Sequence, residues 1–290
     1  MRALPDDWPL REHSRFVTAG GLRWHVQCLG HGPVVLLVHG TGAATHTWRG
    51  LAPLLARHYT VVAPDLPAHG GTARPGDDTL MTLPGMAGGL RALLAALDVE
   101  PVLAVGHSAG AAILARMCLD GAIAPRGLVS LNGALLELPG LPRAVFSPLA
   151  RLLAASPLPR LFAWRAGDRS AVERLVASTG SRLDPEGVDF YARLVRDPAH
   201  VEGVLTMMAR WDLAPLEADL PALAVPLLLV VGLQDRTVPP SEGRRVRERV
   251  PGAEIVELPG LGHLAHEERP ATVEQLLRQF ARRTGVPADR

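Results

Sequence analysis

The sequence predicts an α/β fold in which a mostly parallel sheet is flanked by helices. Short, continuously apolar runs alternate with amphipathic segments of helical length, and most of these runs end in a loop that holds Gly, Asp or His. A Leu-, Ala-, Arg- and Pro-rich stretch without convincing strands at 135–220 further predicts a helical cap inserted between two strands. We therefore expect a core domain made of residues 1–134 and 221–290, and a cap made of residues 135–220.

The individual elements follow from the local patterns. A hairpin around Gly20 and Gly21 is expected to pair residues 15–19 with residues 23–29. Apolar or β-branched runs predict further strands at 34–38, 60–63, 102–105, 128–131, 227–231 and 254–258. Apolar residues at three- and four-residue spacing predict helices at 83–97, 109–119 and 272–280, and in the insertion at 147–155 and 171–179.

Composition excludes several classes of function. The 30 basic residues nearly balance the 29 acidic ones, and no basic run is dense enough to follow a phosphate backbone, so no nucleic-acid partner is expected. All the basic residues are Arg, and the absence of Lys excludes a P-loop and a Schiff-base mechanism. We expect no cofactor.

Cysteine usage and apolar windows bear on location. Cys28 and Cys118 form no CxxC pattern and predict neither a disulfide framework nor a zinc ribbon. No secretory signal is visible at the N-terminus, and the most hydrophobic window, 222–233, is shorter than the ~20 residues that span a bilayer. We expect a cytoplasmic protein without a transmembrane segment.

The strongest chemical signal is the pentapeptide from Gly106 to Gly110, with Ser108 at its centre. It follows a predicted strand and precedes a predicted helix, which is the context that a G-x-S-x-G nucleophile turn requires. A chance match in a chain rich in Gly and Ala is the alternative. The context favours Ser108 as a nucleophile.

A serine nucleophile needs a general base and a carboxylate that orients the base. In chain order the candidates are Asp235, at the end of the predicted strand 227–231, and His263, in a Gly-flanked loop after strand 254–258. Asn132 and Glu137 lie where a substitute acid could enter, and Asp235 could instead be a helix cap. His266, three residues after His263, suggests a metal pair, but no third ligand falls at a closing spacing, so we predict no metal site.

An oxyanion intermediate needs two backbone N–H donors. We expect them from Ala109, which follows the nucleophile, and from Thr41 in the loop from His39 to Gly42. This Gly-rich loop could also be a phosphate cradle, but it does not match G-x-G-x-x-G.

Together these features resemble the α/β-hydrolase superfamily over nearly the whole chain. The motifs include the turn at 64–70, where Ala68 stands at a position that is often Gly in the family. The resemblance extends to the BchO group, named as magnesium chelatase accessory proteins of bacteriochlorophyll biosynthesis. It rests on segments 7–9, 14–17, 21–27, 39–48, 130–135, 162–166 and 207–213.

The resemblance leaves three functions open. The first is a serine hydrolase, esterase-like and of class EC 3.1, that acts on an apolar substrate such as a tetrapyrrole. The second is a non-catalytic porphyrin-binding accessory protein, and the third is a cofactor-free haloperoxidase or C–C bond hydrolase. Haloalkane dehalogenases and epoxide hydrolases normally carry Asp at the position of Ser108. The resemblance also makes magnesium chelatase subunits candidate partners.

The predicted cap carries aromatic residues that could form a binding pocket. Flat rings near Arg165 and Arg210 suit a large planar ligand that bears carboxylates. For each ring alone, a place in the cap core is the simpler interpretation. As a set we expect the substrate pocket to be lined by Gly40, His107, Phe162, Trp164, Met207 and Trp211.

Overall fold

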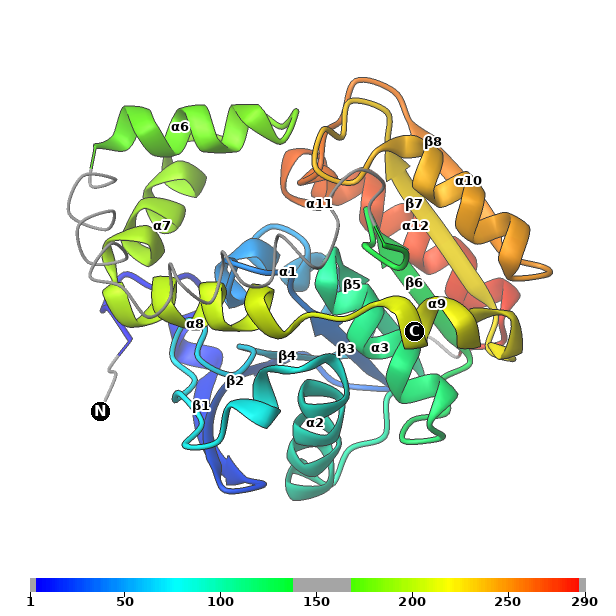
Figure 1. Ribbon diagram of the computed structural model, residues 1–290, viewed down its shortest axis with the longest axis horizontal. Helices are drawn as coiled ribbons and strands as arrows, with labels where there is room; N and C mark the ends of the chain where they lie inside the picture. Colours follow the sequence, from blue (N-terminus) through cyan, green and yellow to red (C-terminus); the bar gives the residue numbers. More distant parts are fainter. Residues whose placement is uncertain (1–3, 138–167, 287–290) are drawn as a thin grey trace.

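The computed structural model describes residues 4–137 and 168–286 (Figure 1). An eight-stranded sheet runs through the part of the chain that it describes, in the order β1-β2-β4-β3-β5-β6-β7-β8. The strands are β1 Ser14–Ala19, β2 Leu22–Leu29, β3 Val34–Val38, β4 Thr60–Pro64, β5 Leu103–His107, β6 Gly127–Leu131, β7 Leu227–Gly232 and β8 Glu254–Leu258. Strand β2 is antiparallel to β1 and β4, and the pairs from β4 to β8 are parallel. The predicted mostly parallel sheet is confirmed.

Helices cover both faces of this sheet. In chain order they are α1 Ala52–Leu55, α2 Leu83–Leu97, α3 Ala109–Leu119, α6 Arg169–Ser178, α7 Pro185–Arg196, α8 Pro198–Arg210, α9 Ala214–Asp219, α10 Pro240–Arg249, α11 Ala265–Glu268 and α12 Pro270–Arg283. Short 3₁₀ turns lie at η1 Arg11–His13, η2 Thr45–Trp48, η3 Asp78–Met81 and η4 Leu220–Ala222. In the described residues, no helix is both long and apolar enough to cross a membrane.

Side chains of one strand alternate between two apolar cores, as the two-residue period of a strand requires. In β3, Leu36 belongs to the core beneath α2 and α3, whereas Val35 and Leu37 belong to the core that contains Leu277 and Phe280 of α12. Both cores are closed to water, which explains why the central strands are apolar throughout rather than at every second position.

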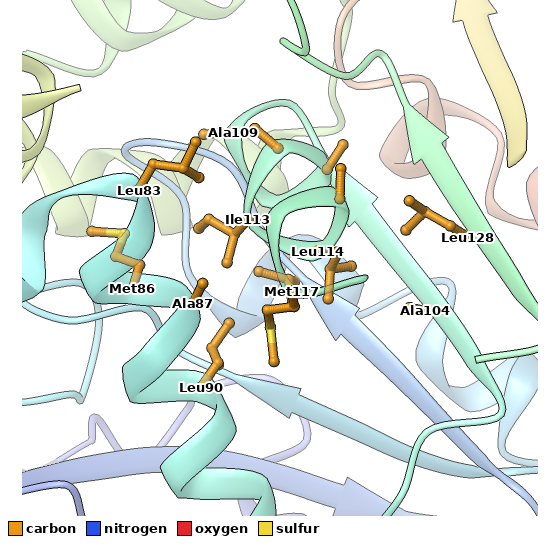
Figure 2. Close-up of a cluster of buried hydrophobic side chains, with 14 of the residues drawn as sticks. Leu83, Met86, Ala87, Leu90, Ala104, Ala109, Ile113, Leu114, Met117 and Leu128 are labelled. Carbon is orange, nitrogen blue, oxygen red and sulfur yellow. The ribbon is translucent and has the colours of Figure 1, made fainter. Parts of the chain in front are cut away.

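The first of these cores shows why α2 and α3 form where the sequence predicts them. Figure 2 shows side chains from α2 facing side chains from α3 above the sheet strands. The labelled members are Leu83, Met86, Ala87, Leu90, Ala104, Ala109, Ile113, Leu114, Met117 and Leu128. Helix α2 begins where the Thr82 hydroxyl accepts from the Gly85 N–H, and it ends at Asp98, whose φ of 54° is left-handed.

The observed boundaries differ from the sequence prediction in a few places. The strand expected at 102–105 is β5, which runs on to His107, and the last helix extends at both ends to Pro270–Arg283. Residues after His263, expected to form a loop, include the short helix α11. Helices α6–α9 lie between β6 and β7 in the chain, while the helix expected at 147–155 lies outside the described residues.

Candidate active site

Ser108 occupies a strained turn between β5 and α3. Its φ of 51° and ψ of −118° lie outside the ordinary regions for a residue with a side chain. A Cβ at Gly106 would lie 2.4 Å from the Ala111 nitrogen, and a Cβ at Gly110 would lie 2.1 Å from the Val38 oxygen. The two glycines of the motif are therefore required by close backbone contact.

Backbone hydrogen bonds hold the turn, and the Ser108 hydroxyl does not cap helix α3. The Ser108 N–H donates to the Leu131 oxygen at 3.1 Å, and the Ser108 carbonyl accepts from Ala111 and Ala134. The Ser108 side chain makes no capping bond to α3 and is half-buried. The hydroxyl is therefore presented at the carboxyl end of β5.

Asp235 and His263 form a buried pair. His263 Nδ1 lies 2.7 Å from Asp235 Oδ2, and the two side chains are 8% and 0% exposed. Asp235 Oδ1 accepts from the backbone N–H groups of Thr237 and Val238, at 2.8 and 2.9 Å. The carboxylate is thus held on both oxygens, and Nδ1 of a neutral His263 carries the shared proton, which leaves Nε2 free to accept another.

Asn132 adds a donor that sequence reasoning did not assign. Its Nδ2 donates to Asp235 Oδ2 at 2.8 Å, and its φ of 47° is left-handed. The sequence places Asn132 where a substitute for the acid could enter, whereas in the structure it donates to Asp235. Glu137, the other candidate substitute, is exposed, and no hydrogen bond joins it to His263 within the residues that the structure describes.

The sheet order explains why these residues meet. Strands β5, β6, β7 and β8 are consecutive neighbours, and Ser108, Asn132, Asp235 and His263 follow them one by one. The carboxyl ends of parallel strands lie at one edge, where open α/β sheets bind their ligands.

Two further histidines lie near His263, and their rings are tilted against one another. The His107 ring lies 4.7 Å from the His263 ring and 4.4 Å from the His266 ring, and His107 Nε2 donates to the His263 carbonyl at 2.9 Å. Burial lowers the pKa of His107 well below its usual value and that of His266 to about 3. Both rings are therefore neutral near neutral pH, and they fix the position of the His263 loop rather than exchange protons.

The structure offers no support for a metal site built on His263 and His266. His266 directs Nε2 to the Thr47 hydroxyl at 2.8 Å. Across residues 4–137 and 168–286 no group of three or more His, Cys, Asp or Glu is arranged to hold a metal ion.

The loop after β3 lies directly against Ser108. A Cβ at Gly40 would come within 2.8 Å of the Ser108 Cβ. His39 donates from Nδ1 to the Gly40 carbonyl at 2.8 Å and accepts at Nε2 from the Leu66 N–H, and burial lowers its pKa. In the described part of the chain, the N–H groups of Thr41 and Ala109 have no recorded hydrogen-bond acceptor.

A buried carboxylate anchors the far end of the same loop. Asp65 accepts from the Thr45 N–H at 2.6 Å and the Gly71 N–H at 2.7 Å, and pairs with His25 Nδ1 at 2.6 Å. Burial alone would raise the pKa of Asp65, but His25 and these donors hold it well below its usual range. Ala68 in the following turn has a φ of 62°, which lies in the left-handed region that favours Gly.

Helix α8 covers the loop after β3. The Thr41 hydroxyl donates to Met207 Sδ at 3.7 Å, and a Cβ at Gly203 would lie 2.6 Å from the Ala68 Cβ. Met207 is fully buried, and Trp211 is partly buried against the core beneath α2 and α3. Phe162, Trp164 and Arg165 lie outside the described residues, and Arg210 pairs with Asp78.

A polar network that the sequence analysis missed ties α7 to α11. Glu267 is buried and accepts from the Thr47 hydroxyl, the Arg49 guanidinium and, at 2.7 Å, the Tyr191 hydroxyl. Arg49 also pairs with Asp184 at 3.0 Å. These residues are scattered over 220 positions of the sequence, so no local pattern connects them.

Comparison with known proteins agrees with this architecture. The family model described as "Alpha/beta hydrolase family" matches residues 35–276. The chain is 39% identical over 269 residues to the "Magnesium-chelatase 30 kDa subunit" of Rhodobacter capsulatus, which covers 92% of this chain and 93% of that protein. It is 31% identical over 269 residues to the "Pyrrolizixenacetamide deacetylase" of Xenorhabdus hominickii, with coverage of 89% and 94%.

Solved structures support the same fold. A meta-cleavage product hydrolase from Pseudomonas fluorescens IP01 superposes with a TM-score of 0.78 at 20% identity, over 95% of this chain and all of that one. At this identity the likeness bears on the fold alone. The match to the family model over most of the chain and the similarity to full-length relatives lead to one conclusion: the chain belongs to the alpha/beta hydrolase family.

Proposed function

We propose that the protein is a serine hydrolase that cleaves an ester or related acyl group of an apolar substrate. Ser108 Oγ attacks the carbonyl carbon while His263 Nε2 takes its proton, and the leaving alcohol then receives that proton. Water, deprotonated by His263, releases the acid from the acyl-enzyme. Asp235 orients the imidazole and stabilises its charged form.

The buried bond between Asp235 and His263 carries this proposal. A carboxylate with two backbone donors on one oxygen has few orientations available, so it holds the imidazole in one tautomer. No hydrogen bond joins Ser108 Oγ to His263 in the described residues, and such bonds are often long before substrate binds. His107, which precedes Ser108 and contacts the His263 ring, keeps the Ser108 and His263 side chains in the same region.

The oxyanion donors are the second part of the proposal. The N–H groups of Thr41 and Ala109 flank the place where Gly40 meets Ser108. Removal of one such donor typically costs about 10²–10³ in kcat. We propose that both N–H groups bind the oxygen that becomes negative during attack by Ser108.

Labelling with a fluorophosphonate, which reacts only with activated serines, tests the nucleophile. We expect one adduct, located by mass spectrometry on Ser108, and no adduct in Ser108→Ala. Ser130, which is buried at the end of β6, provides an internal comparison that should stay unmodified. Folded protein without an adduct would contradict the proposal and favour a binding function.

We further propose that the substrate belongs to magnesium–tetrapyrrole metabolism and that the protein associates with magnesium chelatase. The support is the relative at 39% identity whose name is that of a chelatase subunit. The contact between Met207 of α8 and Thr41 supports a cap over the loop that adjoins Ser108. Co-purification with separately expressed chelatase subunits tests the association, and absence of any complex at micromolar concentrations would contradict it.

A further inference from the structure

A short connection between α6 and α7, residues 179–182, passes between the loops that carry Asp235 and His263. The Thr179 carbonyl accepts from the Arg236 N–H at 3.1 Å and from the His263 N–H at 3.4 Å. The Thr179 oxygen therefore links the backbone of His263 to that of Arg236, the residue that follows Asp235.

The contact is too close to admit a side chain. Gly180 has a φ of +85°, and a Cβ there would lie 1.8 Å from the Gln234 carbonyl oxygen. A Cβ at Gly262 would lie 2.3 Å from the Gly180 carbonyl carbon. The three loops thus meet backbone against backbone, where only glycine fits.

Two side chains complete the junction. The buried Ser181 hydroxyl accepts from the Leu264 N–H at 2.8 Å. Glu268 accepts from the Gly262 N–H at 2.9 Å on one oxygen and from the Arg182 N–H at 3.1 Å on the other. The N–H groups of His263 and Leu264 therefore donate to residues 179–182. The Gly262 N–H donates to Glu268, which also accepts from Arg182.

We infer that residues 179–182 are a positioning element of the acid–base pair, so that the connection between α6 and α7 is a working part of the active site. Displacement of α6 and α7 would withdraw the Thr179 and Ser181 oxygens and allow the His263 loop to separate from Asp235. The inference rests on the proposed hydrolase function, and residues 179–182 act through His263 without touching the reacting atoms.

A matched pair of glycine substitutions tests it. Gly180→Ala and Gly252→Ala place the same methyl group at nearly the same φ, +85° and +83°, but Gly252 has nothing within 4 Å of the added Cβ. We expect Gly180→Ala to slow fluorophosphonate labelling of Ser108 and to lower kcat at least about 100-fold with little change in KM, because small displacements of catalytic groups cost this much. Gly252→Ala should stay within about twofold of wild type.

A spectroscopic measurement separates positioning from general damage. The proton on His263 Nδ1, shared with Asp235, should give a low-field NMR signal in wild type and Gly252→Ala and lose it in Gly180→Ala. Equal labelling and equal NMR signals in the two folded variants would overturn the inference. If wild type shows this signal but no labelling of Ser108, the hydrolase proposal fails while the inference on positioning is still decided by Gly180→Ala.

A milder pair covers the case in which Gly180→Ala does not fold. Ser181→Ala removes the acceptor for Leu264, whereas Ser178→Ala removes an exposed hydroxyl that bonds within α6. We expect Ser181→Ala to lower kcat about five- to tenfold, the usual effect of one lost hydrogen bond, and Ser178→Ala to leave it unchanged. Equal kcat values for these two variants would overturn the inference.

Discussion

Replacement of Asp235 by Asn tests the acid with almost no change in shape. The carboxylate accepts four hydrogen bonds: on Oδ1 from the N–H groups of Thr237 and Val238, and on Oδ2 from His263 and Asn132. An amide has one accepting oxygen and one donating nitrogen, so it cannot satisfy all four donors.

The structure predicts which way the amide turns. With its oxygen towards Thr237 and Val238, only the Asn132 donor is left without an acceptor, and the amide nitrogen donates to His263 Nδ1. With the opposite orientation, both backbone donors are left unpaired. The difference of one buried donor, about 1–3 kcal/mol, favours the first orientation by a factor of about 5 to 160.

The favoured orientation gives the wrong tautomer. When Nδ1 accepts, the proton resides on Nε2, and the imidazole cannot take a proton from Ser108. The minority with the right tautomer lacks the negative charge that stabilises the imidazolium. The two effects together predict a loss in kcat of about 10³–10⁴, or about 4–5.5 kcal/mol, on an aryl ester substrate.

The assay is kcat and KM on the aryl ester, with thermal unfolding recorded for the same preparation. Glu137→Gln is the matched control, since it makes the same kind of change at an exposed carboxylate and should have no effect. Full activity in folded Asp235→Asn would refute the assignment, and Glu137 would be the next residue to change.

Four further predictions follow from the site. The pH dependence of hydrolysis should carry no contribution from His107 or His266, because burial lowers the pKa of both rings and keeps them neutral; a steep, two-proton curve would contradict these low pKa values. The free energy of unfolding from urea titrations should fall as the pH decreases from about 6.5 towards 3, because the unfolded chain protonates His266 while the folded chain keeps it neutral. Asn132→Gly, which suits the left-handed φ but removes the amide donor, should lower kcat about tenfold, whereas unchanged kcat would show that Asp235 needs no such support. A protoporphyrin-type ligand should quench Trp fluorescence at micromolar concentration and inhibit labelling of Ser108, and saturable quenching that survives combined Trp164→Ala and Trp211→Ala would place the ligand elsewhere.

The sequence predicts the parts of this molecule that depend on neighbouring residues. The turn at Ser108 is encoded by two glycines and by the flanking strand and helix, so one short stretch of the sequence suffices to locate it. The mostly parallel sheet follows from continuous apolar strands, since a strand with water on one face would alternate.

The contacts that the sequence does not reveal depend on the order of strands in the sheet. Asn132 meets Asp235 because β6 lies beside β7, although 103 positions separate the two residues. Glu267 bonds with Arg49 and Tyr191 only once α7 packs near α11. Glu267 lies in a charged stretch of the sequence, and only its burial in α11 shows that it joins two parts of the fold.

The environment of His263 also suits the proposed acid–base pair of His263 and Asp235. A positive charge on His107 or His266 would repel a second charge on His263, since the His107 ring lies 4.7 Å from the His263 ring and 4.4 Å from the His266 ring. Burial removes this conflict by keeping both rings neutral. A protonated His263 would therefore have the negative charge of Asp235 at hydrogen-bond distance. Asn132 and two backbone N–H groups hold the Asp235 carboxylate in place. These supports come from the end of β6, from the turn after β7 and, through Thr179, from the α6–α7 connection. A change in any one of them should therefore alter the position of the His263 ring and, through it, the reactivity of Ser108.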